Sequence, residues 1–229
     1  VRVVGEQIFF TSVDEIIEDG RESLRLWATN GKATPIELVS GVSLSLFASD
    51  ANAPTIMFET DGKLGFVVYG ADGRGALWTS DGTVLGTSQV RDLGEYTSQP
   101  FGEIYSTAIG ELGYFTFGNK EAGYELWVTN GTAAGTFVYD INPGSDSSMP
   151  SDFVEWRGEL HFSADNGSVG AEVWKVNGKL PTAGDVNGDG AFTIRDFLIL
   201  SSNFGKSEDA VAAEGDLDGD GDVDFRDFL

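Results

Sequence analysis

The chain has 229 residues, enough for one or two domains, and 41% of them are apolar, so a packed core can form. Its formal net charge of −23 makes nucleic acid and anionic membrane surfaces poor partners, because contacts to phosphate need Lys and Arg. Cysteine is absent, which excludes disulfides, zinc thiolates, iron–sulfur clusters and cysteine nucleophiles.

The sequence contains no apolar run of about 18 residues, so we predict no membrane span. It begins with Val1 and carries no signal peptide. We interpret the chain as a mature or truncated piece of a longer protein.

Residues 1–180 contain a repeat of about 50 residues. Tryptophan recurs in the segments LRLWATNG, ALWTSDGT, ELWVTNGT and EVWKVNG, at Trp27, Trp78, Trp127 and Trp174. Each of these segments follows a strand-like partner, namely GEQIFFTS, GKLGFVVYG, GELGYFTFG or GELHFSAD. Self-similarity at a fixed period of this length predicts a solenoid, a propeller or an array.

The repeats alternate apolar and polar residues with a period of two, and Asn-Gly, Asp-Gly and Pro-Gly turns separate them. We assign four short strands to the last repeat: TFVYDI, PSDFVEW, ELHFSAD and AEVWKVN. Four-stranded units of this length are typical of propeller blades. Counting two strands and then three sets of four predicts about three and a half blades, which form an incomplete ring. We interpret VDEIIEDG as a loop insertion.

One motif carries a resemblance. The segment ELWVTNGTAAGTFVYDINPG resembles the ELWxxDGT repeat of large bacterial surface and secreted proteins, and ALWTSDGT matches it in the preceding repeat. The resemblance implies a mainly β, β-propeller-like fold with no established activity. The matching residues of the third repeat are Leu126, Trp127, Asn130, Gly131, Thr132, Gly135 and Thr136.

The aromatic residues of the repeats have two interpretations. A tryptophan at a fixed strand position is expected to pack in the core between blades. Trp156 breaks the period and lies between Glu155 and Arg157 near a turn, so it is the candidate exposed platform for a sugar ring; the alternative is a contact at the rim. His161 is the only histidine, and we interpret it as a strand residue without a catalytic role.

The acidic residues of the repeats recur at equivalent places. Glu111 and Glu159 lie in equivalent GEL turns, and Glu125 and Glu172 precede tryptophans at equivalent positions. Acids that repeat with the blades indicate blade architecture, or at most weak cation sites. A glycosidase would need two carboxyl groups in unlike environments.

A second duplication lies near the end of the chain, where GDVNGDGAFTIRDFL starts at Gly184 and GDLDGDGDVDFRDFL at Gly215. Calcium takes about six to eight oxygen ligands, and a loop of about twelve residues supplies them at alternating positions around a glycine. Acidic Asp/Asn/Gly clusters also form plain turns, but two copies in phase favour calcium. We predict two Ca²⁺ sites, with ligands Asp185, Asn187, Asp189, the Ala191 carbonyl, Thr193 and Asp196, and Asp216, Asp218, Asp220, the Asp222 carbonyl, Asp224 and Asp227.

The first calcium loop leads into a predicted helix. Ile194, Phe197, Leu198 and Phe204 fit one face of a short helix that ends at Gly205. No amphipathic helix precedes Asp185, since the sequence there is KLPTAG. The unit is therefore a loop followed by a helix, used twice.

A duplicated calcium loop with an exit helix, Asp at the last loop position and no entering helix resembles a type I-like dockerin module. The resemblance implies a small α domain with two EF-hand-like calcium loops, which attaches polysaccharide-degrading enzymes to cohesin domains on a scaffold or cell surface. This chain departs from the family at the adjacent pair that often sets cohesin choice. Here the pairs are Ile194-Arg195 and Phe225-Arg226 rather than small hydroxyl residues, and the second exit helix is barely one turn long at Leu229.

These patterns predict two domains, a repeat region at 1–180 and a dockerin-like domain at 181–229. We expect a non-enzymatic extracellular or bacterial cell-surface binding or scaffolding protein, whose partners are a cohesin-like domain or surface protein and carbohydrate. Millimolar calcium outside cells suits weak loops of this kind. The alternatives are a fragment of a dockerin-tethered polysaccharide-degrading enzyme and a purely structural surface adhesin.

Overall fold

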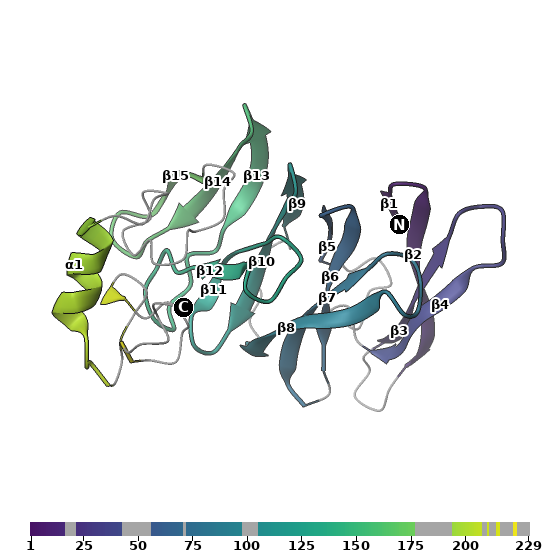
Figure 1. The fold of residues 1–229 in the computed structure, drawn as a ribbon, viewed down its shortest axis with the longest axis horizontal. Coiled ribbons are helices and arrows are strands. Elements are labelled where there is room, and N and C mark those ends of the chain that lie inside the picture. The colour runs from purple at the N-terminus through teal and green to yellow at the C-terminus, as the bar shows by residue number, and fades with distance from the viewer. Residues whose placement is uncertain are drawn as a thin grey trace. The chain divides into compact units, whose positions relative to one another are not determined.

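A computed structural model gives the fold (Figure 1). The chain divides into two compact units, Val1–Gly178 and Lys179–Leu229, here called the repeat unit and the C-terminal unit. The structure describes residues 1–16, 22–42, 56–70, 72–97, 105–176, 194–207, 210, 214–215 and 222–223.

The described part of the repeat unit consists of four antiparallel sheets, each with its strands in sequence order. Sheet I contains β1 (Arg2–Val4), β2 (Gln7–Ile16), β3 (Glu22–Thr29) and β4 (Ile36–Val42). Sheet II contains β5 (Met57–Thr60), β6 (Lys63–Tyr69), β7 (Arg74–Ser80) and β8 (Thr87–Glu95). Sheet III contains β9 (Ser106–Ile109), β10 (Leu112–Asn119), β11 (Gly123–Thr129) and β12 (Thr136–Tyr139). Sheet IV contains β13 (Ser151–Trp156), β14 (Glu159–Asp165) and β15 (Ala171–Val176).

The same register recurs in every sheet. The periodic tryptophan lies on the third strand and pairs with a phenylalanine of the second strand: Phe10 with Trp27, Phe66 with Trp78, Phe115 with Trp127 and Phe162 with Trp174. Tight turns join the first two strands, and in sheets II and IV both turn residues have positive φ, as hairpins of this length favour. The register makes positions in different sheets directly comparable.

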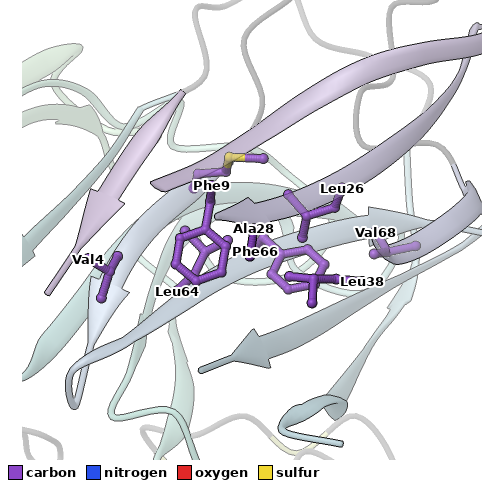
Figure 2. Packing of buried hydrophobic residues seen from close by; sticks show 9 residues of the cluster. Val4, Phe9, Leu26, Ala28, Leu38, Leu64, Phe66 and Val68 are labelled. Carbon is purple, nitrogen blue, oxygen red and sulfur yellow. The ribbon is translucent and has the colours of Figure 1, made fainter. Parts of the chain in front are cut away.

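Successive sheets pack face to face. Phe9 and Leu26 of sheet I meet Leu64 and Phe66 of sheet II in one buried cluster (Figure 2). A second cluster joins sheets II and III, and its members include Phe58, Val67, Leu77, Phe115, Phe117 and Trp127.

The first strands of the sheets also follow one another. Strand β1 contacts β5, β5 contacts β9, and β9 contacts β13. Sheets that stack face to face with their first strands in succession are typical of propeller blades. The described residues do not close into a ring.

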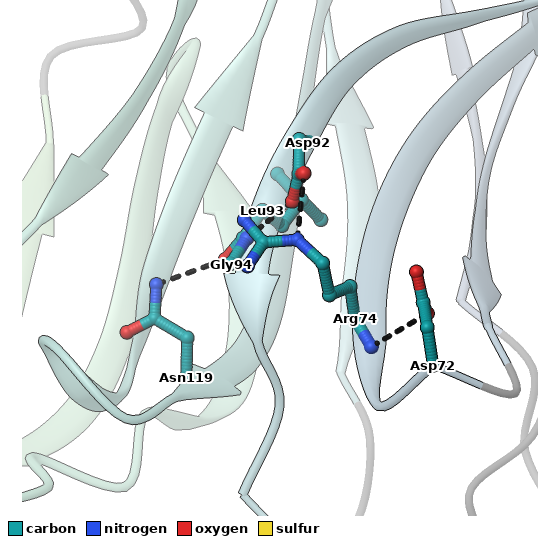
Figure 3. A network of polar contacts seen from close by, with 6 residues as sticks. All are labelled: Asp72, Arg74, Asp92, Leu93, Gly94 and Asn119. Carbon is teal, nitrogen blue, oxygen red and sulfur yellow. Dashed lines mark hydrogen bonds and ion pairs between the residues drawn. The ribbon is translucent and has the colours of Figure 1, made fainter.

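Polar contacts join sheets II and III at one end (Figure 3). Asn119 of β10 donates from Nδ2 to the Leu93 carbonyl of β8 at 2.9 Å. The neighbouring Arg74 donates from Nε to Asp92 at 2.8 Å, and Asp92 also accepts from the backbone N–H of Gly94 at 2.8 Å. These bonds hold the end of β8 where it meets β10.

The predicted strand allocation was wrong at three places. Sheet I has four strands rather than two, because RVV forms β1 and IELVSGV pairs with β3 as β4. The start of VDEIIEDG continues β2, through a register shift between Val13 and Glu15, rather than forming a loop insertion. TFVYDI supplies β12 of sheet III, where Phe137 pairs with Val128, rather than opening the last repeat. Sheet IV accordingly has three strands in the described part of the chain.

The C-terminal unit contains helix α1 (Ile194–Asn203), as predicted. Gly205 follows with φ of 89°, a left-handed conformation that ends helices and favours glycine. Leu200 packs with Ala210 and Val223 in the buried core of the unit. The backbones of Gly205 and Val223 bond at 2.9 Å, and those of Val223 and Lys206 at 2.8 Å. Helical segments in the described residues lack the length and hydropathy that crossing a bilayer requires.

Candidate functional site

Helix α1 exposes the apolar face that its sequence pattern defined. Ile194, Phe197 and Leu198 lie one turn apart, with exposed fractions of 68%, 45% and 58%. Leu200, on the other side of the helix, is fully buried in the core of the unit. Phe204, just past the helix end, is half exposed as well. The amphipathic pattern was correct, but its more apolar side points to solvent.

The middle of the second predicted calcium loop is fixed in the core. Val223 is fully buried, and its N–H and carbonyl both bond to the segment after α1. Gly215, at the start of the same repeat, has φ of 117°, and a Cβ there would lie 2.7 Å from Leu200 Cδ2. The second loop is therefore anchored to the helix that follows the first loop.

Few of the predicted calcium ligands are among the described residues. Asp196 lies in the first turn of α1, and Asp222 is half buried directly before Val223. The described residues hold no group of three or more His, Cys, Asp or Glu side chains placed to bind a metal. The other predicted ligands lie outside the described residues: Asp185, Asn187, Asp189, Ala191, Thr193, Asp216, Asp218, Asp220, Asp224 and Asp227.

The donor chemistry of these positions fits calcium. Carboxylate, carboxamide, hydroxyl and carbonyl oxygens are the hard ligands that Ca²⁺ takes, and the sequence offers no thiol and no second histidine to favour a softer metal. Burial of Val223 holds the adjacent Asp222 backbone near the segment that follows α1.

In the repeat unit, Trp156 is exposed, as the off-period position suggested. Its side chain is 54% accessible, and the Arg157 guanidinium carbon lies 4.3 Å from the centre of its ring. His161 contacts the same ring in a T-shaped arrangement with ring centres 5.6 Å apart. Arg157 thus covers part of the surface that a sugar ring would need.

The periodic tryptophans support the core interpretation. Trp127 is buried in the cluster between sheets II and III, and Trp78 packs against the cluster between sheets I and II. Trp174 is half buried and donates from Nε1 to the Ala164 carbonyl at 3.0 Å. Trp27 stacks on Phe10 with ring centres 6.4 Å apart.

Glu125 is the buried carboxyl of the described chain, and its environment differs from that of its repeat equivalent, the exposed Glu172. It accepts hydrogen bonds from the backbone N–H of Ser148 at 2.8 Å and of Ile141 at 3.1 Å, and from the Ser148 hydroxyl. Burial, with a smaller contribution from Asp140, raises the pKa of Glu125 to about 7. The repeat pattern gave no sign of this, because the loop that buries Glu125 lies far along the chain.

The contacts of Glu125 indicate a structural role. A raised carboxyl pKa is common in catalytic acids. Here, however, the side chain is closed off from solvent, and its three bonds hold the segment between Ile141 and Ser148. The same burial raises the pKa of Asp140, which accepts from the Gly144 N–H at 3.2 Å. Glu159 is instead paired with Lys175 at 2.9 Å, which lowers the Glu159 pKa.

A surface hollow on sheet II was missed by sequence reasoning, since its lining comes from three strands. It is lined by residues that include Arg74, Trp78, Gln89 and Asp92. The hydrogen bond from Arg74 is the main cause that lowers the pKa of Asp92. Trp78 Nε1 is buried and has no hydrogen-bond partner among the described residues. The Trp78 indole, beside the polar side chains of Arg74 and Gln89, is a second candidate contact for a polar ligand.

Comparison with known protein families identifies the C-terminal region. Residues 183–229 match the family model of the dockerin type I domain. The chain therefore carries a C-terminal dockerin module, as the duplicated loops suggested. Comparisons with curated proteins and with solved structures gave no match.

Proposed function

We propose that this protein is a non-enzymatic extracellular or cell-surface binding protein, which its C-terminal unit docks to a cohesin domain when calcium is bound. The observation that carries the proposal is the dockerin match at residues 183–229 together with the exposed apolar face of α1. Dockerin modules occur in extracellular polysaccharide-degrading systems, where calcium-dependent docking to cohesin is their role.

The exposed face of α1 has the features of a docking surface. Soluble proteins leave few large apolar side chains clustered in solvent, and such clusters mark interaction sites. Ile194, Phe197 and Leu198 form one stripe, and Arg195 is exposed beside it. Aromatic and arginine side chains contribute strongly at interfaces. A cohesin surface with a matching apolar patch and acidic rim is the partner this face fits.

Calcium has a structural role in this proposal. When bound, it would neutralise the clustered carboxylates of the two loops. Val223 and Gly215 connect the second loop to Leu200 on the buried side of α1. Ordering of the loops would therefore fix the position of the helix, and metal binding energy would become folding energy of the unit.

The test measures binding of the full chain to a purified type I cohesin by calorimetry, with and without calcium. We expect binding that needs calcium and that weakens at least about tenfold in Leu198→Glu. Leu85→Glu is the matched control, because Leu85 is 99% exposed in the repeat unit. Equal cohesin affinity of the two variants would contradict the role of α1. Saturation near two calcium ions, lost in an Asp185→Ala/Asp216→Ala variant, would support both predicted sites.

The repeat unit would supply the binding surface that the dockerin module tethers. The hollow beside Trp78 is its candidate carbohydrate contact, because Arg157 covers part of the Trp156 ring. Retention on a panel of immobilised glycans, compared between the parent and Gln89→Ala, tests this, because Gln89 lines the hollow and is exposed. The alternative is a fragment of a tethered polysaccharide-degrading enzyme. Turnover of one of these glycans, abolished by a single carboxylate substitution, would favour the enzyme over the binding protein.

A further inference from the structure

The repeated register shows what each face of a sheet contacts. We call the face that points to the next sheet the forward face and the opposite one the rear face. The residue directly before each periodic tryptophan lies on the forward face. Leu26, Leu77 and Leu126 are all 0% exposed at this position, whereas Val173 of sheet IV is 81% exposed. The position is the same, so the difference lies in what covers it.

The first strand repeats this contrast. The last residue before the first turn is Val4, Thr60, Ile109 or Trp156 in the four sheets. The first three are buried, and Thr60 bonds across to the Glu111 carbonyl of sheet III at 2.9 Å. Trp156 is the exposed one. The forward face of sheet IV thus presents Val154, Trp156 and Val173 on its two outer strands, without a following sheet in the described chain.

Sheet I shows the complementary situation on its rear face. Ile8 corresponds in register to Leu64 and Leu160, which are fully buried, but Ile8 is 37% exposed. Its strand neighbour Val3 is 60% exposed. Phe10 and Trp27 stack on this face and are half buried, whereas Phe66 and Phe115 at the position of Phe10 are fully buried.

We propose that the forward face of sheet IV binds the rear face of sheet I of a second copy of this chain. The contact would continue the packing that already joins sheet I to sheet II and sheet II to sheet III. Two copies that make this contact twice would close a ring of eight sheets, the upper end of the usual propeller range. Glu159 and Lys175 on the sheet IV face are paired at 2.9 Å, so their charges would enter the interface as a neutral pair.

A glycan is a less suitable occupant of this face. Sugar stacking needs an open aromatic ring, and Arg157 lies over the Trp156 ring while His161 contacts it. Trp156 on β13 and Val173 on β15 are exposed at positions whose register equivalents in sheets I to III are buried. A surface of this extent and pattern matches another sheet better than a single sugar ring.

The experiment is sedimentation velocity of the full chain with calcium, over a wide range of concentrations and at moderate salt to screen the net charge of −23 per copy. We expect the parent to dimerise. Val173→Asp and Val3→Asp should each weaken self-association at least about tenfold. Val169→Asp is the matched control, because Val169 is 69% exposed in the turn after β14 and lies off the face. Unchanged far-ultraviolet circular dichroism would show that the variants fold.

Mixing the two variants distinguishes a head-to-tail contact from others. An equimolar mixture of Val173→Asp and Val3→Asp keeps one intact pair of faces, so it should form a dimer that neither variant forms alone. A parent that stays at 24.4 kDa throughout would overturn the proposal. So would a dimer that survives either variant, or a monomer whose sheet IV face retains immobilised glycans in a manner that depends on Trp156.

Discussion

The described parts of the two units bury very different amounts of apolar surface. The repeat unit packs clusters of aromatic and aliphatic side chains between successive sheets, with Phe58, Phe66 and Phe115 fully buried. In the described part of the C-terminal unit, three side chains are buried: Leu200, Ala210 and Val223. A unit of about 50 residues is small enough that a metal or disulfides usually support its core. The contrast leads us to expect one unit that folds without a ligand and one whose stability depends on calcium.

Removal of calcium should produce the largest difference in stability between the two units. We expect a chelator to unfold the C-terminal unit and leave the repeat unit intact, because a ligand at about a thousand times its Kd stabilises by about 4 kcal/mol. Limited proteolysis with and without chelator, read by mass spectrometry, measures this. A C-terminal unit equally protected in both conditions would contradict the proposed role of calcium.

Truncation of a residue between sheets should have the next largest effect, and only on the repeat unit. Leu126→Ala removes a fully buried side chain and is expected to cost about 2–5 kcal/mol of unfolding free energy. Val173→Ala at the equivalent position, which is exposed, should cost little in dilute solution. Denaturant unfolding monitored by tryptophan fluorescence compares the two. Similar losses would show that sheet IV is covered in solution.

A glycine substitution tests the small core of the C-terminal unit. Gly215→Ala places a Cβ against Leu200 at a φ of 117°, so we expect a loss of about 1–3 kcal/mol in calcium-loaded stability. Gly205→Ala is the control, because its φ is also positive but no heavy atom lies within 4 Å of the added Cβ. Thermal melts in saturating calcium should rank Gly215→Ala below Gly205→Ala. The reverse order would mean that the Leu200 contact does not limit the unit.

Glu125 should give the stability of the repeat unit a pH dependence. Its pKa of about 7 in the fold lies above the ordinary 4.5, so the folded state binds the proton more tightly. This contribution to stability is complete below about pH 4.5 and is lost as the pH rises through about 7.

The measurement compares unfolding free energies of the parent and Glu125→Gln from pH 4.5 to 8. We expect the difference between them to change by about 1–3 kcal/mol across this range. The ion pairs Arg74–Asp92 and Lys120–Glu95 are present in both proteins, so their contributions cancel in this difference. Pairing also lowers the pKa of Asp92 and of Glu95, so these carboxylates affect stability at more acidic pH. A difference that stays constant with pH would show that Glu125 does not titrate in this range.

The sequence by itself determined the repeat, the strand type, helix α1 and the dockerin module. Each depends on local order: alternation and turns define strands such as GKLGFVVYG, helical spacing with Gly205 defines α1, and the loop motif requires its oxygens at fixed intervals. The calcium ligands themselves stay a prediction, apart from the family-level support for calcium binding.

Only the tertiary structure decided which equivalent residues are buried. Glu125 and Glu172 occupy equivalent sequence positions, but the loop through Ser148 closes over Glu125 alone. The segment TFVYDI fits the last strand of one sheet as well as the first strand of the next. Its pairing with β11 makes it the last strand of sheet III. Leu126 and Val173 likewise differ in exposure because a sheet packs on the first, and the apolar stripe of α1 faces outward because Leu200 takes the core. Periodicity specifies a side chain's place within a sheet or helix, but burial depends on neighbours that the chain brings from elsewhere.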